Sequence, residues 1–86
     1  MRREPDFFDG QEMDLVFIAK KLQHALTLEE ALTQAEIDYA VEVDEYQGGV
    51  IFKSTRQGAF IYVLPDQLDR ACQVTRQAGF TPFEPI

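Results

Sequence analysis

The sequence predicts a single α+β domain: an antiparallel sheet with two helices packed on one face. Apolar runs rich in β-forming residues alternate with two segments that have the apolar spacing of helices. Glycine-containing turns separate the strands in the middle of the chain. A length of 86 residues, 45% of them hydrophobic, provides for one core and an ordinary supply of side chains to fill it.

Residues 1–13 are predicted as a loose N-terminal arm, and residues 14–86 as the folded domain. The arm is rich in charged residues, and its apolar anchors are Phe7, Phe8 and Met13. Two adjacent aromatic rings are costly to leave in water, so docking of the Phe pair on the domain is an alternative.

The domain begins with a predicted strand and helix. The apolar run in Asp14–Ala19 is typical of a central strand buried on both faces. Residues 22–26 are then expected to form a connection. Thr27 and Glu30 have the spacing of a capping box, which predicts that a helix begins at Thr27. Apolar residues follow at helical spacing: Leu28, Ala31, Leu32 and Ala35.

The middle of the chain is predicted to be a meander. Residues 39–44 alternate apolar and polar side chains, as a half-exposed strand does. Turns are expected at 47–49 and 56–58, with a short strand at 50–52 between them and a longer strand at 59–64 after them. A single hairpin with a bulged arm is the alternative.

The last part predicts a helix and an edge strand. Pro65 stops the preceding strand, and Asp66 is the expected N-cap. Gly79 is expected just after the helix, in the left-handed conformation. Residues 80–83 are expected to form a final strand at a sheet edge, because Pro82 cannot donate to a ladder. The inner face of the helix is formed by Leu68, Ala71, Cys72, Thr75 and Ala78.

The resulting order, β-α-β-(β)-β-α-β, is the split βαβ or ferredoxin-like plan. Two right-handed crossovers place both helices on the same side of the sheet, which leaves the other side bare. The first and third long strands are apolar at consecutive positions, so half of their side chains must point to the bare side. The candidates are Val16 and Ile18 or Leu15 and Phe17, with Ile61 and Val63 or Phe60 and Tyr62. We take Val16, Ile18, Ile61 and Val63 as the interface of a homodimer; cover by the arm, by another protein, or no cover at all are the alternatives.

Composition and charge limit the function. Fifteen acidic against eight basic residues give a net charge of -7, which disfavours nucleic acid as a partner. We expect no membrane association, since no apolar run approaches the length of a bilayer span, and no secretory signal is recognisable at the start, so a cytoplasmic location is expected. The single cysteine and the absence of Cys/His spacing motifs predict no metal and no cofactor.

Candidate ligand-binding residues are few. Lys53 and Arg56 lie between the two predicted turns and form a small basic cluster, which is a candidate site for a small anionic ligand. The alternative function is therefore that of a ligand sensor. Lys20 and His24, together with Lys21, lie where the first strand leads into the first helix and form a second candidate for an anion. Cys72 is expected to be a small buried hydrophobe. No base, nucleophile and metal stand together, so we predict no enzyme.

Several segments carry a resemblance: residues 29–32 running into 37–39, the glycine turns, and 62–66 entering 68–71. In element order and turn placement the chain resembles small bacterial GlnB-like or ACT-like ferredoxin-fold proteins, including a prokaryotic signal-transducing family. The resemblance implies a regulatory, often oligomeric module without chemistry of its own. The chain departs from the pattern in having Glu36 where a helix-ending glycine is common. It also lacks the long ligand loop of nitrogen regulators and the glycine-rich junction of ACT domains, so no ligand residues are carried over.

Overall fold

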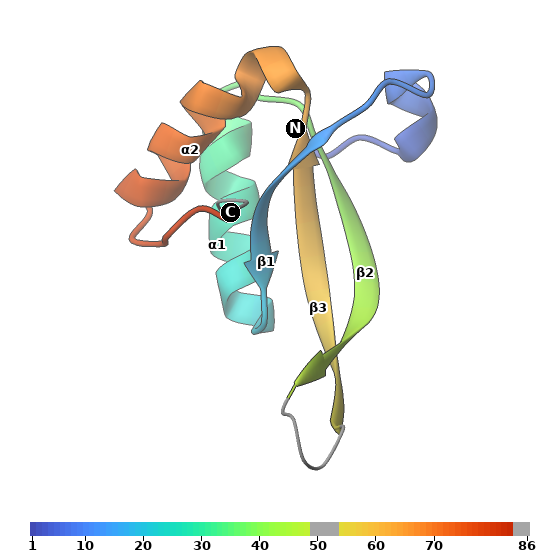
Figure 1. The fold of residues 1–86 in the computed structure, drawn as a ribbon. Coiled ribbons are helices and arrows are strands. Elements are labelled where there is room, and N and C mark those ends of the chain that lie inside the picture. The colour runs from blue at the N-terminus through green and yellow to red at the C-terminus, as the bar shows by residue number, and fades with distance from the viewer. Residues whose placement is uncertain (49–53, 84–86) are drawn as a thin grey trace.

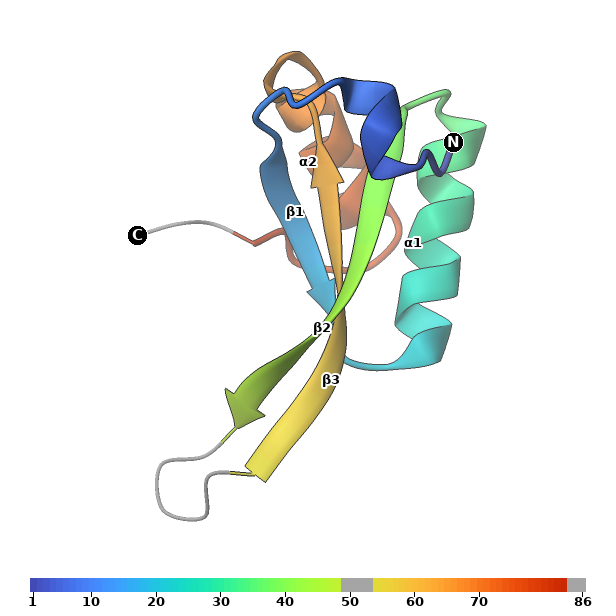
Figure 2. The same ribbon diagram turned by 90° about the vertical axis from the view of Figure 1, so that its right-hand side faces the viewer.

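The computed structural model describes the backbone of residues 1–48 and 54–83, and within them the side chains other than those of Pro5, 44–48 and 54–57. The chain forms a sheet with two helices on one side and a short N-terminal helical turn on the other (Figures 1 and 2). The predicted α+β class is confirmed. The elements are η1 (Pro5–Phe8), β1 (Asp14–Ala19), α1 (Leu22–Gln34), β2 (Tyr39–Gly48), β3 (Ser54–Val63), η2 (Pro65–Gln67) and α2 (Leu68–Gln77).

The sheet is antiparallel, in the order β1-β3-β2. β1 has the predicted bounds, but it lies at an edge of the described sheet and not in its centre. The final strand expected at 80–83 is wrong, because these residues take no strand conformation. One backbone hydrogen bond nevertheless links this segment to the sheet. The Phe83 N–H donates to the Val16 carbonyl at 2.6 Å, which holds the segment against the outer edge of β1.

The two long strands of the middle region pair directly with each other, antiparallel and without a bulge. Their register runs without interruption from Tyr39 opposite Val63 to Gly48 opposite Ser54. The turn expected at 56–58 is therefore wrong: those residues belong to β3, where Gly58 pairs with Asp44. The short strand expected at 50–52 lies outside the described residues.

Helix α1 begins at Leu22, five residues before the expected Thr27, so residues 22–26 are helical and not a connection. The N–H of Ala25 already donates to the Lys21 carbonyl at 3.2 Å, and Ala25 is buried. Thr27, the residue with the capping-box spacing, therefore lies inside the helix and not at its start. The buried face of α1 begins at Ala25, about one turn before Leu28.

Both helices end in a Schellman motif, in which the residue after the cap is left-handed. In α2 this residue is Gly79, as predicted, with φ of 94° and the Phe80 N–H bonded to the Thr75 carbonyl at 3.1 Å. In α1 it is Glu36, with φ of 61°, and the Ile37 N–H bonds to the Leu32 carbonyl at 3.0 Å. Asp66 is not an N-cap, because η2 occupies 65–67 and Gln67 precedes α2.

The core lies between the sheet and the two helices. Its members are almost fully shielded from solvent and come from the three strands, the two α-helices and the connection after α1: Val16, Leu28, Leu32, Ile37, Tyr39, Ile61, Val63 and Ala71. Phe17 and Phe80 pack against this cluster, with ring centroids 5.1 Å apart. The arrangement confirms that both helices cover the same face.

Candidate functional site

A β-bulge in β1 decides which side chains face the helices. Leu15 pairs with Tyr62 and Phe17 pairs with Ile61, so Val16 is an extra residue in the strand. Val16 and Phe17 consequently both contact the core. Beyond the bulge the alternation resumes with Ile18 opposite Phe60.

The predicted interface is wrong for three of its four residues. Val16, Ile61 and Val63 are 0% exposed and lie in the core under the helices. Of the predicted set, only Ile18 lies on the helix-free side. Directly paired residues share a face of a sheet, so the apolar side chains of this open face are Leu15, Ile18, Phe60 and Tyr62, all of them half-buried.

The open face is partly covered by the N-terminal arm, which is held in place rather than loose. The Arg3 N–H donates to the Tyr39 carbonyl at 2.8 Å, and the Tyr39 N–H donates to the Met1 carbonyl at 3.0 Å. This bonding continues the sheet beyond the edge of β2. Further along the arm, Phe8 is only 3% exposed, whereas Phe7 is 52% exposed. Figure 2 shows η1 in front of the sheet, on the side away from α2.

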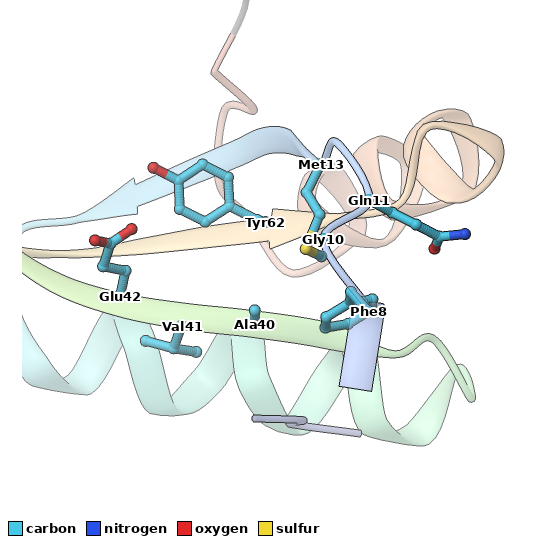
Figure 3. Close-up of a pocket in the computed structure, with 8 residues that line it drawn as sticks. All are labelled: Phe8, Gly10, Gln11, Met13, Ala40, Val41, Glu42 and Tyr62. Carbon is cyan, nitrogen blue, oxygen red and sulfur yellow. The ribbon is translucent and has the colours of Figure 1, made fainter. Parts of the chain in front are cut away.

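A hollow of about 600 Å³ lies between the arm and the sheet. Figure 3 shows Tyr62 and Glu42 projecting from the sheet on the side where Phe8 and Met13 of the arm lie. The remaining lining residues are Gly10, Gln11, Ala40 and Val41. The arm therefore covers one end of the open face incompletely, and Ile18 and Phe60 do not line this hollow.

Polar contacts fix the start of the arm to α1 and β2. Arg3 Nε donates to Asp38 Oδ1 at 2.9 Å, and the Arg3 guanidinium lies 4.5 Å from the Phe7 ring centre. The Tyr39 hydroxyl donates to Glu29 Oε1 at 3.3 Å. Burial raises the pKa of Tyr39 above its ordinary 10.0. Burial also lowers the pKa of the N-terminal amine, which donates to the Ile37 carbonyl.

The structure brings two of the predicted ligand residues together. Lys20 and His24 line a groove of about 570 Å³ together with Lys21, the other lysine of the candidate at the start of the helix. Lys53 lies outside the described residues, and Arg56 is placed only by its backbone, in β3 opposite Tyr46. Sequence reasoning missed the other wall of this groove, formed by Thr81 and Phe83, because it assigned them to an edge strand.

Two further features singled out from the sequence lie apart from this groove or from any metal cluster. Cys72 is half-buried on α2 and does not line the groove. No three or more His, Cys, Asp or Glu side chains among the described residues gather as metal ligands would. Neither described helix has the length and apolar character needed to cross a bilayer.

Comparison with protein families, curated proteins and solved structures finds no match to this chain.

Proposed function

We propose that this chain is a non-catalytic regulatory or protein-interaction module of the ferredoxin-like class, which self-associates through the open face of its sheet. The observation that carries the proposal is the apolar strip across β1 and β3, formed by Leu15, Ile18, Phe60 and Tyr62 on the side without helices. Contiguous apolar patches of this kind mark interaction sites in small proteins.

The strand order supports the ferredoxin-like assignment. In that plan the sheet has four strands, and the fourth lies beside β1, antiparallel to it. The observed order β1-β3-β2 is that of the other three strands. The Phe83–Val16 backbone bond occurs at the edge where that strand belongs. The resemblance to GlnB-like and ACT-like proteins, which are often oligomeric, favours the same assignment.

The energetics of the open face favour association. The four side chains of the strip are half-buried, so part of their apolar surface still contacts water. Covering that surface contributes about 25 cal/mol per Å², before the entropic cost of association. Two copies of a chain with a net charge of -7 repel each other. Because salt screens this repulsion, we expect the dimer to become stronger as ionic strength rises.

The test is the solution mass of the full chain, measured by light scattering over a concentration series at low and high salt. We expect a species of twice the 9.9 kDa chain mass. Ile18→Glu places a charge in the strip and is expected to give a folded monomer. Leu26→Glu is the matched control: Leu26 is exposed on α1, away from the open face, and its substitution should leave the dimer intact.

A parent chain that stays monomeric at high concentration and high salt refutes self-association. A dimer that survives Ile18→Glu but is lost in Leu26→Glu places the interface on the helices and refutes the open face. Circular dichroism of both variants separates loss of association from loss of folding.

A further inference from the structure

Three segments distant in sequence meet around one groove. Phe17, Ile18 and Lys20 come from β1 and the residue that follows it, Lys21 and His24 from the start of α1, and Thr81 and Phe83 from the chain after α2. Figures 1 and 2 show this last segment turning back from α2 toward β1. The backbone bond from Phe83 to Val16 holds it there.

The groove is locally basic in an acidic protein. Its described lining includes two lysines and the chain's single histidine, and it contains no Asp or Glu. Three side chains that can be cationic thus line one groove of a chain whose net charge is -7. Such a cluster attracts anions locally, whereas the net charge of the chain repels them.

The floor of the groove is aromatic. Phe17 and Phe83 line it, and Phe80 supports Phe17 and His24 from behind, with ring centroids 5.1 Å from each of them. The Phe17 ring is fixed by packing against the core, and the Phe83 ring is exposed at 42%, so both offer apolar surface on which another ring can stack. A volume of about 570 Å³ lies in the range of pockets that hold small ligands.

We propose that this basic groove binds a small organic anion that joins a flat aromatic ring to a phosphate, the chemistry of a mononucleotide. The ring stacks on Phe17 and Phe83, and the phosphate lies against Lys20, Lys21 and a ring N–H of His24. Lysine recognises phosphate as a point charge, and stacking on aromatic side chains is tolerant of the identity of the base. The proposed site uses neither Lys53 nor Arg56 and does not depend on self-association.

The probe is AMP, added to the isotopically labelled full chain and followed by amide NMR shifts. We expect saturable shifts at Lys20, Lys21, His24, Thr81 and Phe83. Adenosine and inorganic phosphate, the two halves of the probe, should each bind more weakly than AMP. Lys21→Met is expected to weaken AMP binding by about fivefold, the effect of one close charge in water. Arg70→Met, which removes an exposed charge from α2, is the control and should bind AMP as the parent does.

Two results overturn the proposal. If AMP at millimolar concentration shifts none of these amides, the groove does not bind this chemistry. If Lys21→Met and Arg70→Met weaken binding equally, the effect comes from net charge and not from the groove. Ile18 borders both this groove and the open face, so the variants here avoid it, and failure of this proposal leaves the mass measurement on the dimer unaffected.

Discussion

The two faces of the sheet contain similar apolar residues but are covered in different ways. On the helix side, Val16, Ile61 and Val63 are fully buried against α1 and α2. On the open side, Ile18 and Phe60 remain half-buried, and the cover consists of one short arm. Burial therefore follows from which element packs on a face, and not from the hydrophobicity of the strand.

The two faces should therefore contribute differently to the stability of the chain. The helix-covered face forms the core, so disturbing it should unfold the chain. The arm is fastened by a few backbone bonds and one buried ring, so it should detach at a lower free energy than that of global unfolding. Four pairs of substitutions test this comparison.

The largest effect is expected from truncating the same side chain on the two faces. Ile61→Ala removes a side chain that is 0% exposed and should lower the free energy of unfolding by about 2–5 kcal/mol. Ile18→Ala, on the open face, should cost less than about 1.5 kcal/mol in the monomer. Urea denaturation at two protein concentrations measures both: if the open face is a dimer interface, only the Ile18→Ala loss depends on concentration. Equal losses independent of concentration would contradict the comparison.

The second effect concerns the arm. Phe8→Ala removes its buried ring and should lower stability by about 1–3 kcal/mol, less than a core phenylalanine, because the arm can release. Phe7→Ala, the adjacent and exposed control, loses mainly its contact with Arg3, about 0.5–1 kcal/mol. Hydrogen exchange should accelerate at the Arg3 and Tyr39 amides in Phe8→Ala and little in Phe7→Ala. Unchanged exchange in both variants would show that the ring does not hold the arm.

The third effect is a pH dependence at the edge where the arm, β2 and α1 meet. Burial raises the pKa of Tyr39 in the folded chain above 10.0, so the unfolded chain ionises first as pH rises. The stability contributed by the neutral phenol is complete below pH 10.0 and is lost as pH rises through the higher folded pKa. Tyr39→Phe should cost about 1 kcal/mol at neutral pH, through the lost bond to Glu29, and reduce the alkaline loss.

Urea titrations at neutral pH and above pH 10.0 check this expectation. Thr33→Val is the control, since it removes a polar neighbour of the phenol at 3.4 Å and retains the ionising group. An alkaline loss that is the same in Tyr39→Phe and the parent would assign it to other groups.

The smallest effect is at the end of α1, where the helix layer leads into β2. Glu36 adopts φ of 61°, which is unfavourable for a residue with a side chain, so Glu36→Gly should raise stability by about 0.5–1 kcal/mol. Gly79→Ala makes the reverse change at the equivalent position of α2 and should lower stability by about 1 kcal/mol. Thermal unfolding compares them, and a loss of stability in Glu36→Gly would show that the glutamate makes a contact worth more than the strain.

The sequence by itself determined the features that depend on neighbouring residues. The bounds of β1, the alternation from Tyr39 into β2 and the left-handed Gly79 follow from local patterns, because strand periodicity and helix termination involve residues a few positions apart. The acidic net charge, with which the basic groove contrasts, is likewise a property of composition.

Only the tertiary structure decided the features that depend on pairing between distant segments. The bulge at Val16 exists only against β3, and it alone places Ile18 on the open face and Val16 in the core. The start of α1 was set by packing of Ala25, which overrode the capping pattern at Thr27. The wall of the basic groove at Phe83 required the chain after α2 to return to β1. A one-residue shift in register moves a side chain to the other face of a sheet, and no local pattern contains that information.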